Sequence, residues 1–219
     1  MADLMEYFYS WGLLFVLPFT VFAYVKSNKT ERIKMIVSGI GFGILSLIFA
    51  KDVFMTYWVP RYLIDGVYIE DFLYGFLFAG IIPSMHNIFR NKHMTGELKI
   101  NYLLIVADVL ILVSVFCIMV YIFDFNYIYP LSVVPLIIGI ISFVKVKGDI
   151  KDVLITVGCS VIITVLVYNI IIFIYPGAID NHFLIKGTVL LRVPLTEWLF
   201  AVCLGVGCTY TYEAIFGYK

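Results

Sequence analysis

The sequence predicts an all-α integral membrane protein whose single membrane domain, residues 1–219, contains seven transmembrane helices. Hydrophobic residues make up 63% of the chain and charged residues only 14%, whereas soluble domains carry about 25% charged residues. The mean hydropathy of +1.02 leaves too little polar surface to cover a water-soluble globule. This composition excludes a soluble enzyme, a disordered chain and a disulfide-stapled secreted module.

Seven apolar segments follow one another along the chain, each close to the roughly 20 residues that cross a bilayer. The acidic start, with Asp3 and Glu6, lacks the basic region of a cleavable signal peptide, so we expect none. The connections are short, and the two longest, 51–66 and 176–191, are rich in Pro, Gly, Asp and aromatic residues. The segments run over 8–25, 33–50, 67–89, 101–123, 127–144, 151–175 and 192–216.

The basic residues are distributed unevenly between the two sides of this arrangement. Because cytoplasmic loops are enriched in Lys and Arg, the side with more of them is expected to face the cytoplasm. We therefore predict a multi-pass protein of the cell membrane with its N-terminus outside and its C-terminus in the cytoplasm. Eleven of the 15 basic residues belong to the cytoplasmic set, namely Lys26, Lys29, Arg32, Lys34, Arg90, Lys92, Lys99, Lys145, Lys147, Lys151 and Lys219.

The chain also contains a weak internal repeat. A shift of 126 residues places Val67-Tyr68-Ile69-Glu70-Asp71-Phe72-Leu73-Tyr74 on Val193-Pro194-Leu195-Thr196-Glu197-Trp198-Leu199-Phe200. A shift of 120 places Tyr7-Phe8-Tyr9 on Tyr127-Ile128-Tyr129. We predict a 3+1+3 order: repeat one over 1–95, a connector span within 96–124, and repeat two over 125–219. An even number of spans separates the repeats, so they are parallel and related by an axis along the membrane normal.

Acidic residues open both third spans of the repeats. A carboxylate inside a span costs about 2.5–3.5 kcal/mol on insertion scales and is a functional candidate by default. Glu70, Asp71 and Glu197 are therefore the candidate catalytic residues, with Asp71 as the counterpart of Glu197 and Glu70 beside it. Asp108, in the fourth span, is expected to be a structural partner of a polar group or part of a cavity wall.

Aromatic residues crowd the same layer, including Tyr57 and Tyr62. They are typical of an interfacial aromatic belt, and equally of a wall that stabilises a cation through ring faces. An apolar, aromatic pocket favours the protonated form of a carboxylic acid. The candidate substrate-binding residues are Asp52, Trp58, Tyr68, Phe72, Tyr74, Pro194, Trp198 and Phe200.

Nothing in the sequence indicates a metal or a cofactor, so we expect neither. The four cysteines lie in apolar runs without a C-x-x-C pair, and His86, His93 and His182 are expected at the surface. Gly39-Ile40-Gly41-Phe42-Gly43 lies inside a span, where small residues allow close helix packing. The equal numbers of basic and acidic residues say nothing about nucleic acid, and we expect no such partner.

These motifs together resemble the membrane-embedded carotenoid (lycopene) cyclases, which occur as two small subunits in bacteria and as fused domains in archaea and fungi. The resemblance rests on seven spans, the 3+1+3 repeat and a Pro-x-Glu-Glu-like motif at each third span. The family's proline is Tyr68 in the first repeat, and its two acids are Glu70 and Asp71. The second repeat has Thr196-Glu197 where two acids are usual.

The resemblance implies a redox-neutral cyclisation started by a proton. An acid protonates the terminal double bond of a linear, lycopene-like carotenoid, the next double bond closes a six-membered ring, and a base removes a proton to leave a β-ionone ring. Glu70, Asp71 and Glu197 supply candidates for both roles. The bilayer and other enzymes of carotenoid synthesis are the implied partners.

Two other functions stay open from the sequence. The chain can be a non-catalytic relative that binds or transports an isoprenoid or another lipid, or a cyclase of longer, fifty-carbon carotenoids. A retinal protein is disfavoured because the last span, 192–216, contains no lysine. A prenyltransferase is disfavoured because paired Asp-rich motifs are missing from the sequence.

Overall fold

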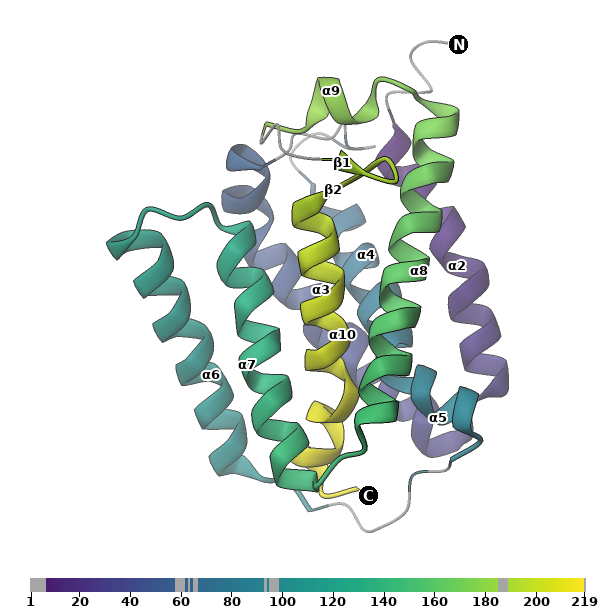
Figure 1. Cartoon of the computed structure of the whole chain (residues 1–219), viewed down its shortest axis with the longest axis vertical. Coiled ribbons are helices and arrows are strands. Elements are labelled where there is room, and N and C mark those ends of the chain that lie inside the picture. Colours follow the sequence, from purple (N-terminus) through teal and green to yellow (C-terminus); the bar gives the residue numbers. More distant parts are fainter. Residues whose placement is uncertain are drawn as a thin grey trace.

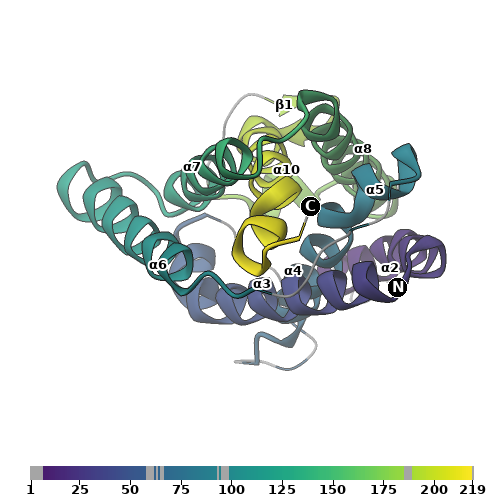
Figure 2. The ribbon, with the colours of Figure 1, turned by 90° about the horizontal axis from the view of Figure 1, so that it is seen from below.

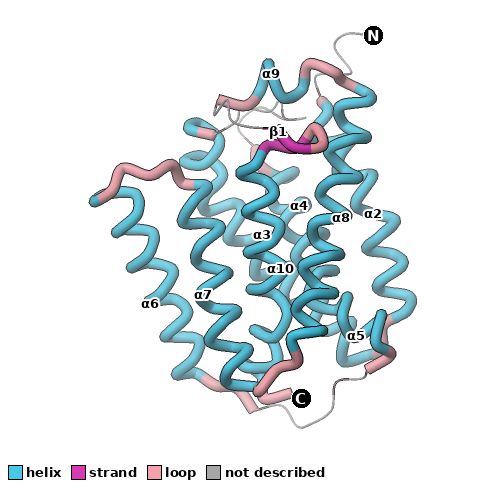
Figure 3. The backbone as a smooth tube through the Cα atoms, viewed as in Figure 1, coloured by secondary structure: helices cyan, strands magenta, loops and turns pink. Residues whose placement is uncertain are grey.

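A computed structural model describes residues 7–57, 62, 64, 67–92, 94, 99–184 and 189–218, with only the backbone described at residues 8 and 52–56. This part of the chain is mostly helical (Figures 1 and 3). Seven of the helices in the described ranges are long and apolar enough to cross a membrane. The predicted set of seven apolar helices is therefore confirmed, and it is that of a multi-pass membrane protein.

The elements follow the predicted order with adjusted ends. They are α2 (Phe8–Lys26), α3 (Lys29–Thr56), α4 (Ile69–Ile81), η1 (Ile82–Ser84), α5 (Met85–Arg90), α6 (Tyr102–Cys117), η2 (Ile118–Ile122), α7 (Ile128–Val146), α8 (Ile150–Ile174), α9 (Ala178–His182), β1 (Val189–Leu190), β2 (Val193–Pro194) and α10 (Leu195–Phe216).

Two predicted spans are interrupted, and one is longer than predicted. The span at 67–89 tightens to a 3-10 turn at Ile82–Ser84, where Pro83 cannot donate a helical hydrogen bond. The span at 101–123 ends in a π-helix, Ile118–Ile122. The second span, predicted over 33–50, runs from Lys29 to Thr56. The last helix begins at Leu195 rather than at 192, because Val193–Pro194 pairs with Val189–Leu190 in a two-residue hairpin.

The helices form two groups of three with one helix outside them. In the first group α4 packs against both α2 and α3, and in the second α10 packs against both α7 and α8. Figure 2 shows the two groups facing each other, with α6 at the edge of the molecule. In each group the third helix along the chain is therefore the central one.

Glycines allow the close approach within each group. A side chain at Gly39 or Gly43 of α3 would collide with Phe76 or Phe72 of α4, at 2.7 Å in both cases. Gly139 of α7 likewise lies against the backbone of α10 around Gly207. Small residues at helix contacts are the usual means by which membrane helices approach closely. The packing role predicted for the glycine run at 39–43 is confirmed at its two ends and not at Gly41, where an added side chain would meet nothing within 4 Å.

Polar contacts join the two groups at the end of the bundle that carries α5, which we call the α5 end. Lys34 of α3 pairs with Glu213 of α10, and both side chains are buried. Arg90 contacts Asp149 and Asp152, and Lys92 lies 2.8 Å from Asp152.

Two predictions at this end of the bundle are wrong. Lys34, counted among the loop residues, lies inside the bundle because Glu213 offers it a buried partner. His86, expected at the surface, is only 2% exposed, and its Nδ1 lies 3.3 Å from the Thr156 hydroxyl. The 3-10 turn at Ile82–Ser84 comes just before His86, in a segment whose side chains are buried. His93 lies outside the described residues.

Removing one member of the buried Lys34–Glu213 pair is expected to destabilise the protein strongly. Lys34→Met should lower the free energy of unfolding by about 3–5 kcal/mol, because it leaves a buried carboxylate without its cation. The double variant Lys34→Met/Glu213→Leu should recover most of this loss, and Lys29→Met, an exposed lysine of the same helix, should change little. Unfolding in detergent by titration with sodium dodecyl sulfate measures all three. Equal losses in Lys34→Met and Lys29→Met would contradict the role of the pair.

Candidate functional site

A cavity of about 240 Å³ lies between the two helix groups. Its wall comes from the first part of α2 and α10, most of α4, the start of α7, and the later parts of α3 and α8, and residues of α9 also line it. It therefore lies toward the end of the bundle that carries α9, which we call the α9 end (Figure 1). Aromatic rings form much of the wall, namely Tyr9, Phe42, Phe49, Tyr57, Tyr74, Phe78, Tyr168, Phe183 and Phe200.

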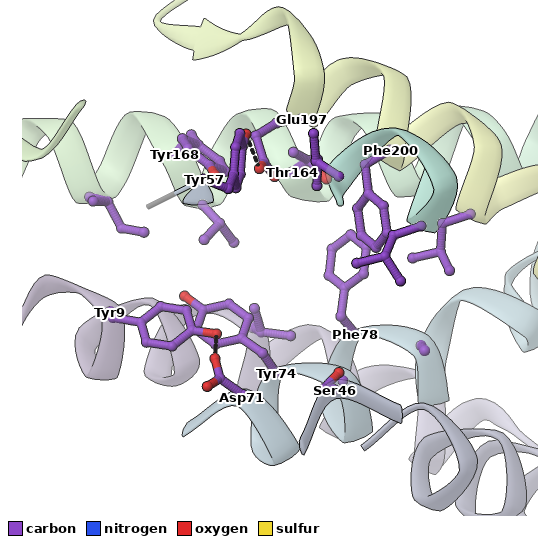
Figure 4. A pocket seen from close by; sticks show the side chains of 18 of the residues that line it. Tyr9, Ser46, Tyr57, Asp71, Tyr74, Phe78, Thr164, Tyr168, Glu197 and Phe200 are labelled. Carbon is purple, nitrogen blue, oxygen red and sulfur yellow. Dashed lines mark hydrogen bonds between the residues drawn. The ribbon is translucent and has the colours of Figure 1, made fainter. Parts of the chain in front are cut away.

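Asp71 and Glu197 are the charged side chains among the described residues that line this cavity. Figure 4 shows them on opposite walls, Asp71 on α4 beside Tyr9, and Glu197 on α10 beside Tyr57. The predicted pairing of these two acids around one pocket thus has the geometry that it requires. A buried carboxyl group needs hydrogen-bonding partners, and tyrosines supply them on both walls.

Two tyrosines donate hydrogen bonds to Asp71. The hydroxyl of Tyr9 lies 2.5 Å from Oδ1, and the hydroxyl of Tyr62 lies 2.9 Å from Oδ2. The Tyr9 ring is stacked on that of Tyr74, with centroids 4.4 Å apart. Both oxygens of Asp71 are therefore held in place, one by Tyr9 of α2 and the other by Tyr62 from the segment that precedes α4.

Glu197 is held mainly by residues from other helices. The Tyr57 hydroxyl donates to Oε1 at 2.6 Å, and the Tyr168 side chain of α8 is a further hydrogen-bonding partner. Thr196 lies 2.6 Å from the Tyr57 hydroxyl. Because that hydroxyl has one hydrogen, which goes to Glu197, Thr196 is the donor in this contact. A short chain of hydroxyl groups thus leads from Thr196 through Tyr57 to Glu197.

The tyrosines act as neutral donors rather than as acids. Burial, and then the neighbouring Glu197 carboxyl group, raise the pKa of Tyr57 well above its ordinary value. Burial and Asp71 do the same to the pKa of Tyr62. Each hydroxyl therefore keeps its proton at neutral pH and points it at a carboxyl oxygen. The arrangement holds two carboxyl groups in fixed orientations on either side of an apolar space, which suits acid and base chemistry.

Glu70 lies near this cavity and does not line it. Its side chain is buried, and Oε1 accepts a hydrogen bond from Ser10 at 3.2 Å. Glu70, predicted as a catalytic candidate that flanks Asp71, thus lies beside it in the chain but is not among the residues that line the cavity. Asp108, on α6, is also absent from the wall, and neither of its carboxylate oxygens has a hydrogen-bond partner among the described residues. The structural partner expected for Asp108 is thus not found.

The predicted substrate-binding residues are divided between the wall and its surroundings. Tyr74 and Phe200 line the cavity. Phe72 is stacked near Phe76, with centroids 6.0 Å apart, and Trp198 donates to the Leu190 carbonyl at 3.1 Å. Tyr68 lies edge-on to Tyr62, Pro194 belongs to strand β2, and Trp58 and the side chain of Asp52 lie outside the described residues.

Sequence reasoning did not name as site residues the four tyrosines that hold the acids. Tyr9 belongs to the Tyr7-Phe8-Tyr9 triplet that opens the first repeat, and Tyr57 and Tyr62 belong to the aromatic layer, so these three carried a signal. Tyr168 lies in an apolar run without any motif. No three His, Cys, Asp or Glu side chains form a metal-binding group within the described residues, and all four cysteines are free thiols.

Comparison with known proteins assigns no family to the chain. No family model matches it, and neither a curated protein nor a solved structure matches it. The function is therefore argued from the cavity itself and from the motifs in the sequence.

The two tyrosines at Asp71 should contribute unequally to stability. Tyr9→Phe is expected to lower the free energy of unfolding by about 1–3 kcal/mol, because it removes a buried donor to a carboxyl group. Tyr62→Phe is the matched control, since it removes the longer bond from a more exposed ring and should cost less. Unfolding in detergent compares them. A larger loss in Tyr62→Phe would show that the wrong tyrosine is assigned as the main partner.

Proposed function

We propose that the protein is a carotenoid end-group cyclase that closes a ring at the end of a linear, lycopene-like carotenoid. One observation carries this proposal: Asp71 and Glu197 face each other across a cavity whose remaining described wall is uncharged and largely aromatic. The motif resemblance at Glu70-Asp71 and Thr196-Glu197 points to the same chemistry.

The reaction needs an acid, a base and a dry, cation-tolerant space. A protonated carboxyl group transfers its proton to the terminal double bond, which leaves a tertiary carbocation. The next double bond attacks this cation, forms the new carbon–carbon bond and moves the positive charge into the ring. The second carboxylate removes a neighbouring proton, and the electrons of that C–H bond form the ring double bond. One proton enters and one leaves, so substrate and product are isomers.

The wall suits these steps. Ring faces attract a positive charge, and Tyr74, Phe78 and Phe200 line the space between the two acids and the far end of the cavity (Figure 4). An apolar wall also keeps out water, which would otherwise capture the cation. Because Asp71 and Glu197 lie on opposite walls, one can protonate a bound chain from one side while the other accepts a proton from the opposite side.

Asp71 and Glu197 together supply the proton donor and the proton acceptor, and Glu70 supports Asp71 from outside the cavity. In a bacterial host that accumulates lycopene, Asp71→Asn and Glu197→Gln should each lower ring formation at least about a hundredfold, the range of general acid–base contributions. Glu70→Gln is the matched control, because it changes a neighbouring carboxyl group that does not line the cavity, and should keep most of the activity. Pigment analysis of cell extracts measures the linear and cyclic products.

Each other outcome changes the assignment in a defined way. Absence of ring formation by a well-inserted wild-type protein would overturn lycopene as substrate, and a host that makes fifty-carbon carotenoids would then test the longer-chain cyclase. Failure on both pigments, with an isoprenoid co-purifying, would replace catalysis by lipid binding or transport. Loss of activity in Glu70→Gln equal to that in Asp71→Asn would move a catalytic role to Glu70.

We further propose that the two helix groups are parallel repeats, α2-α3-α4 and α7-α8-α10, joined by the connector α6. Each repeat has its third helix at the centre and a hydrogen-bonded carboxyl group near the start of that helix, which supports the sequence alignment of Asp71 with Glu197. The excess of Lys and Arg in the connections at the α5 end supports a cytoplasmic location for that end, with the α9 end outside.

The orientation is tested by labelling from one side of the cell membrane. Asp180→Cys, on α9, should react with a membrane-impermeant maleimide in intact cells, because its exposed side chain would face the outside. Lys29→Cys, exposed at the first residue of α3, should react only after permeabilisation. The unmodified protein, with its four native cysteines, gives the background. The reverse pattern would invert the proposed orientation.

A further inference from the structure

The two helix groups meet along two seams that are closed in different ways. On one side α2 packs directly on α8, and a side chain at Gly12 would meet Ile171. On the other side α3 and α7 both line the cavity, through Phe49 and Ile128, without comparable direct packing between their described residues. Helix α6 lies outside this second seam (Figure 2).

One side chain of α6 covers the second seam. The Phe116 ring is stacked on Phe49 of the cavity wall, with centroids 4.8 Å apart, and lies 5.4 Å from Tyr127 at the start of α7. Phe116 is only 9% exposed, whereas Leu110 on the same helix is 60% exposed. The aromatic contact of Phe116 thus bridges α3 and α7 at the height of the cavity, between its wall and the outer surface.

Helix α6 is anchored at one end and loosely held at the other. At the α5 end, Lys99 and Asn101 donate backbone hydrogen bonds to Phe216 and Ile215, at 3.0 and 2.8 Å. Toward the α9 end α6 leans away from α7 (Figure 1). Phe116 is directly followed by Cys117 and then by the π-helix, a feature that is frequent at functional sites. Segments with few buried contacts open at low cost.

The size of the cavity requires an opening for the proposed substrate. A cavity of about 150 Å³ holds benzene, so 240 Å³ has room for about ten carbon atoms on the same scale. That is one end group of a carotenoid, and the rest of the chain must lie outside. An apolar chain dissolved in the bilayer reaches the cavity without crossing water if the opening faces the lipid.

We infer that the seam between α3 and α7 is a lateral entrance from the bilayer, and that Phe116 is its gate. The ring swings away with the loosely held end of α6, one end of a long apolar chain enters between α3 and α7, and the remainder stays in the lipid against α6. This inference rests on the proposed function for the identity of the chain, and the entrance itself is tested without turnover.

The test measures entry with a photoreactive chain. The protein is reconstituted in phosphatidylcholine vesicles, mixed with farnesyl chains that carry a trifluoromethyl-phenyldiazirine, and irradiated briefly at increasing times. Mass spectrometry then compares the label on cavity peptides around Tyr74 and Phe78 with the label at lipid-facing Leu103, which is 80% exposed. Phe116→Ala should speed cavity labelling roughly two- to tenfold, because loss of an aromatic stacking pair raises the population of the open entrance by about that factor. Phe116→Leu should give a smaller increase, and Phe116→Trp a decrease.

Two further variants define the seam. Leu110→Ala, a matched truncation on the outer face of α6, should leave the labelling rate unchanged. Ile171→Ala truncates a side chain that lies at the seam between α2 and α8 and also lines the cavity, so it is compared with Phe116→Ala rather than used as a neutral control. A faster rate in Ile171→Ala alone, with none in Phe116→Ala, would place the entrance on the opposite side. If Phe116→Ala does not fold, the Leu and Trp variants carry the comparison.

The outcomes separate this inference from the proposed function. Labelling that depends on Phe116, in a protein that cyclises no carotenoid, keeps the entrance and removes the cyclase. Ring formation together with labelling that is indifferent to every Phe116 variant keeps the cyclase and overturns the entrance.

Discussion

The organisation of this protein depends on holding carboxyl groups inside an apolar bundle, where each one is costly unless it has hydrogen-bonding or ionic partners. Helix α10 carries two of them, and each has a partner on the α3 side: Tyr57, just after α3, for Glu197, and Lys34, near the start of α3, for Glu213. Glycines bring the helices together within each group, as at Gly39 and Gly43. Polar contacts therefore fasten one group to the other at both ends, and the cavity lies where the two groups leave a space between them.

Much of the fold and part of the site could be predicted from the sequence, for identifiable physical reasons. Apolar stretches of about 20 residues predict membrane spans with little ambiguity, so all seven helices could be predicted. The aligned motifs also predicted that Asp71 and Glu197 share one pocket. The partners were harder to find, because pairs such as Lys34 and Glu213 are 179 residues apart and sit in unrelated local patterns. Tyr168 could not be predicted for the same reason. A tyrosine in an apolar run is typical of ordinary packing, and only the fold brings Glu197 beside it.

The two acids of the cavity are not equivalent, although the sequence alignment pairs them. Asp71 receives donors at both oxygens, from Tyr9 and Tyr62, and its helix group supplies most of that environment. Glu197 is reached by a chain of hydroxyl groups and by residues of α8 and the end of α3. A reaction that needs one donor and one acceptor of protons is better served by such a pair than by two identical sites. The difference arises from tyrosine placement, since the carboxyl groups themselves are alike in chemistry.

The connector helix gives a reason for the asymmetry of the whole molecule. If α2-α3-α4 and α7-α8-α10 are related by a twofold axis, that axis exchanges the seam between α2 and α8 with the seam between α7 and α3. Two identical seams would both close by direct packing, as α2 does on α8. Helix α6 lies along only one of them (Figure 2) and contributes Phe116 in place of helix–helix contact. If the halves are parallel repeats, they need a connector span to restore the chain direction. The same span, α6, would then leave one seam covered by a single helix instead of by direct packing between the halves.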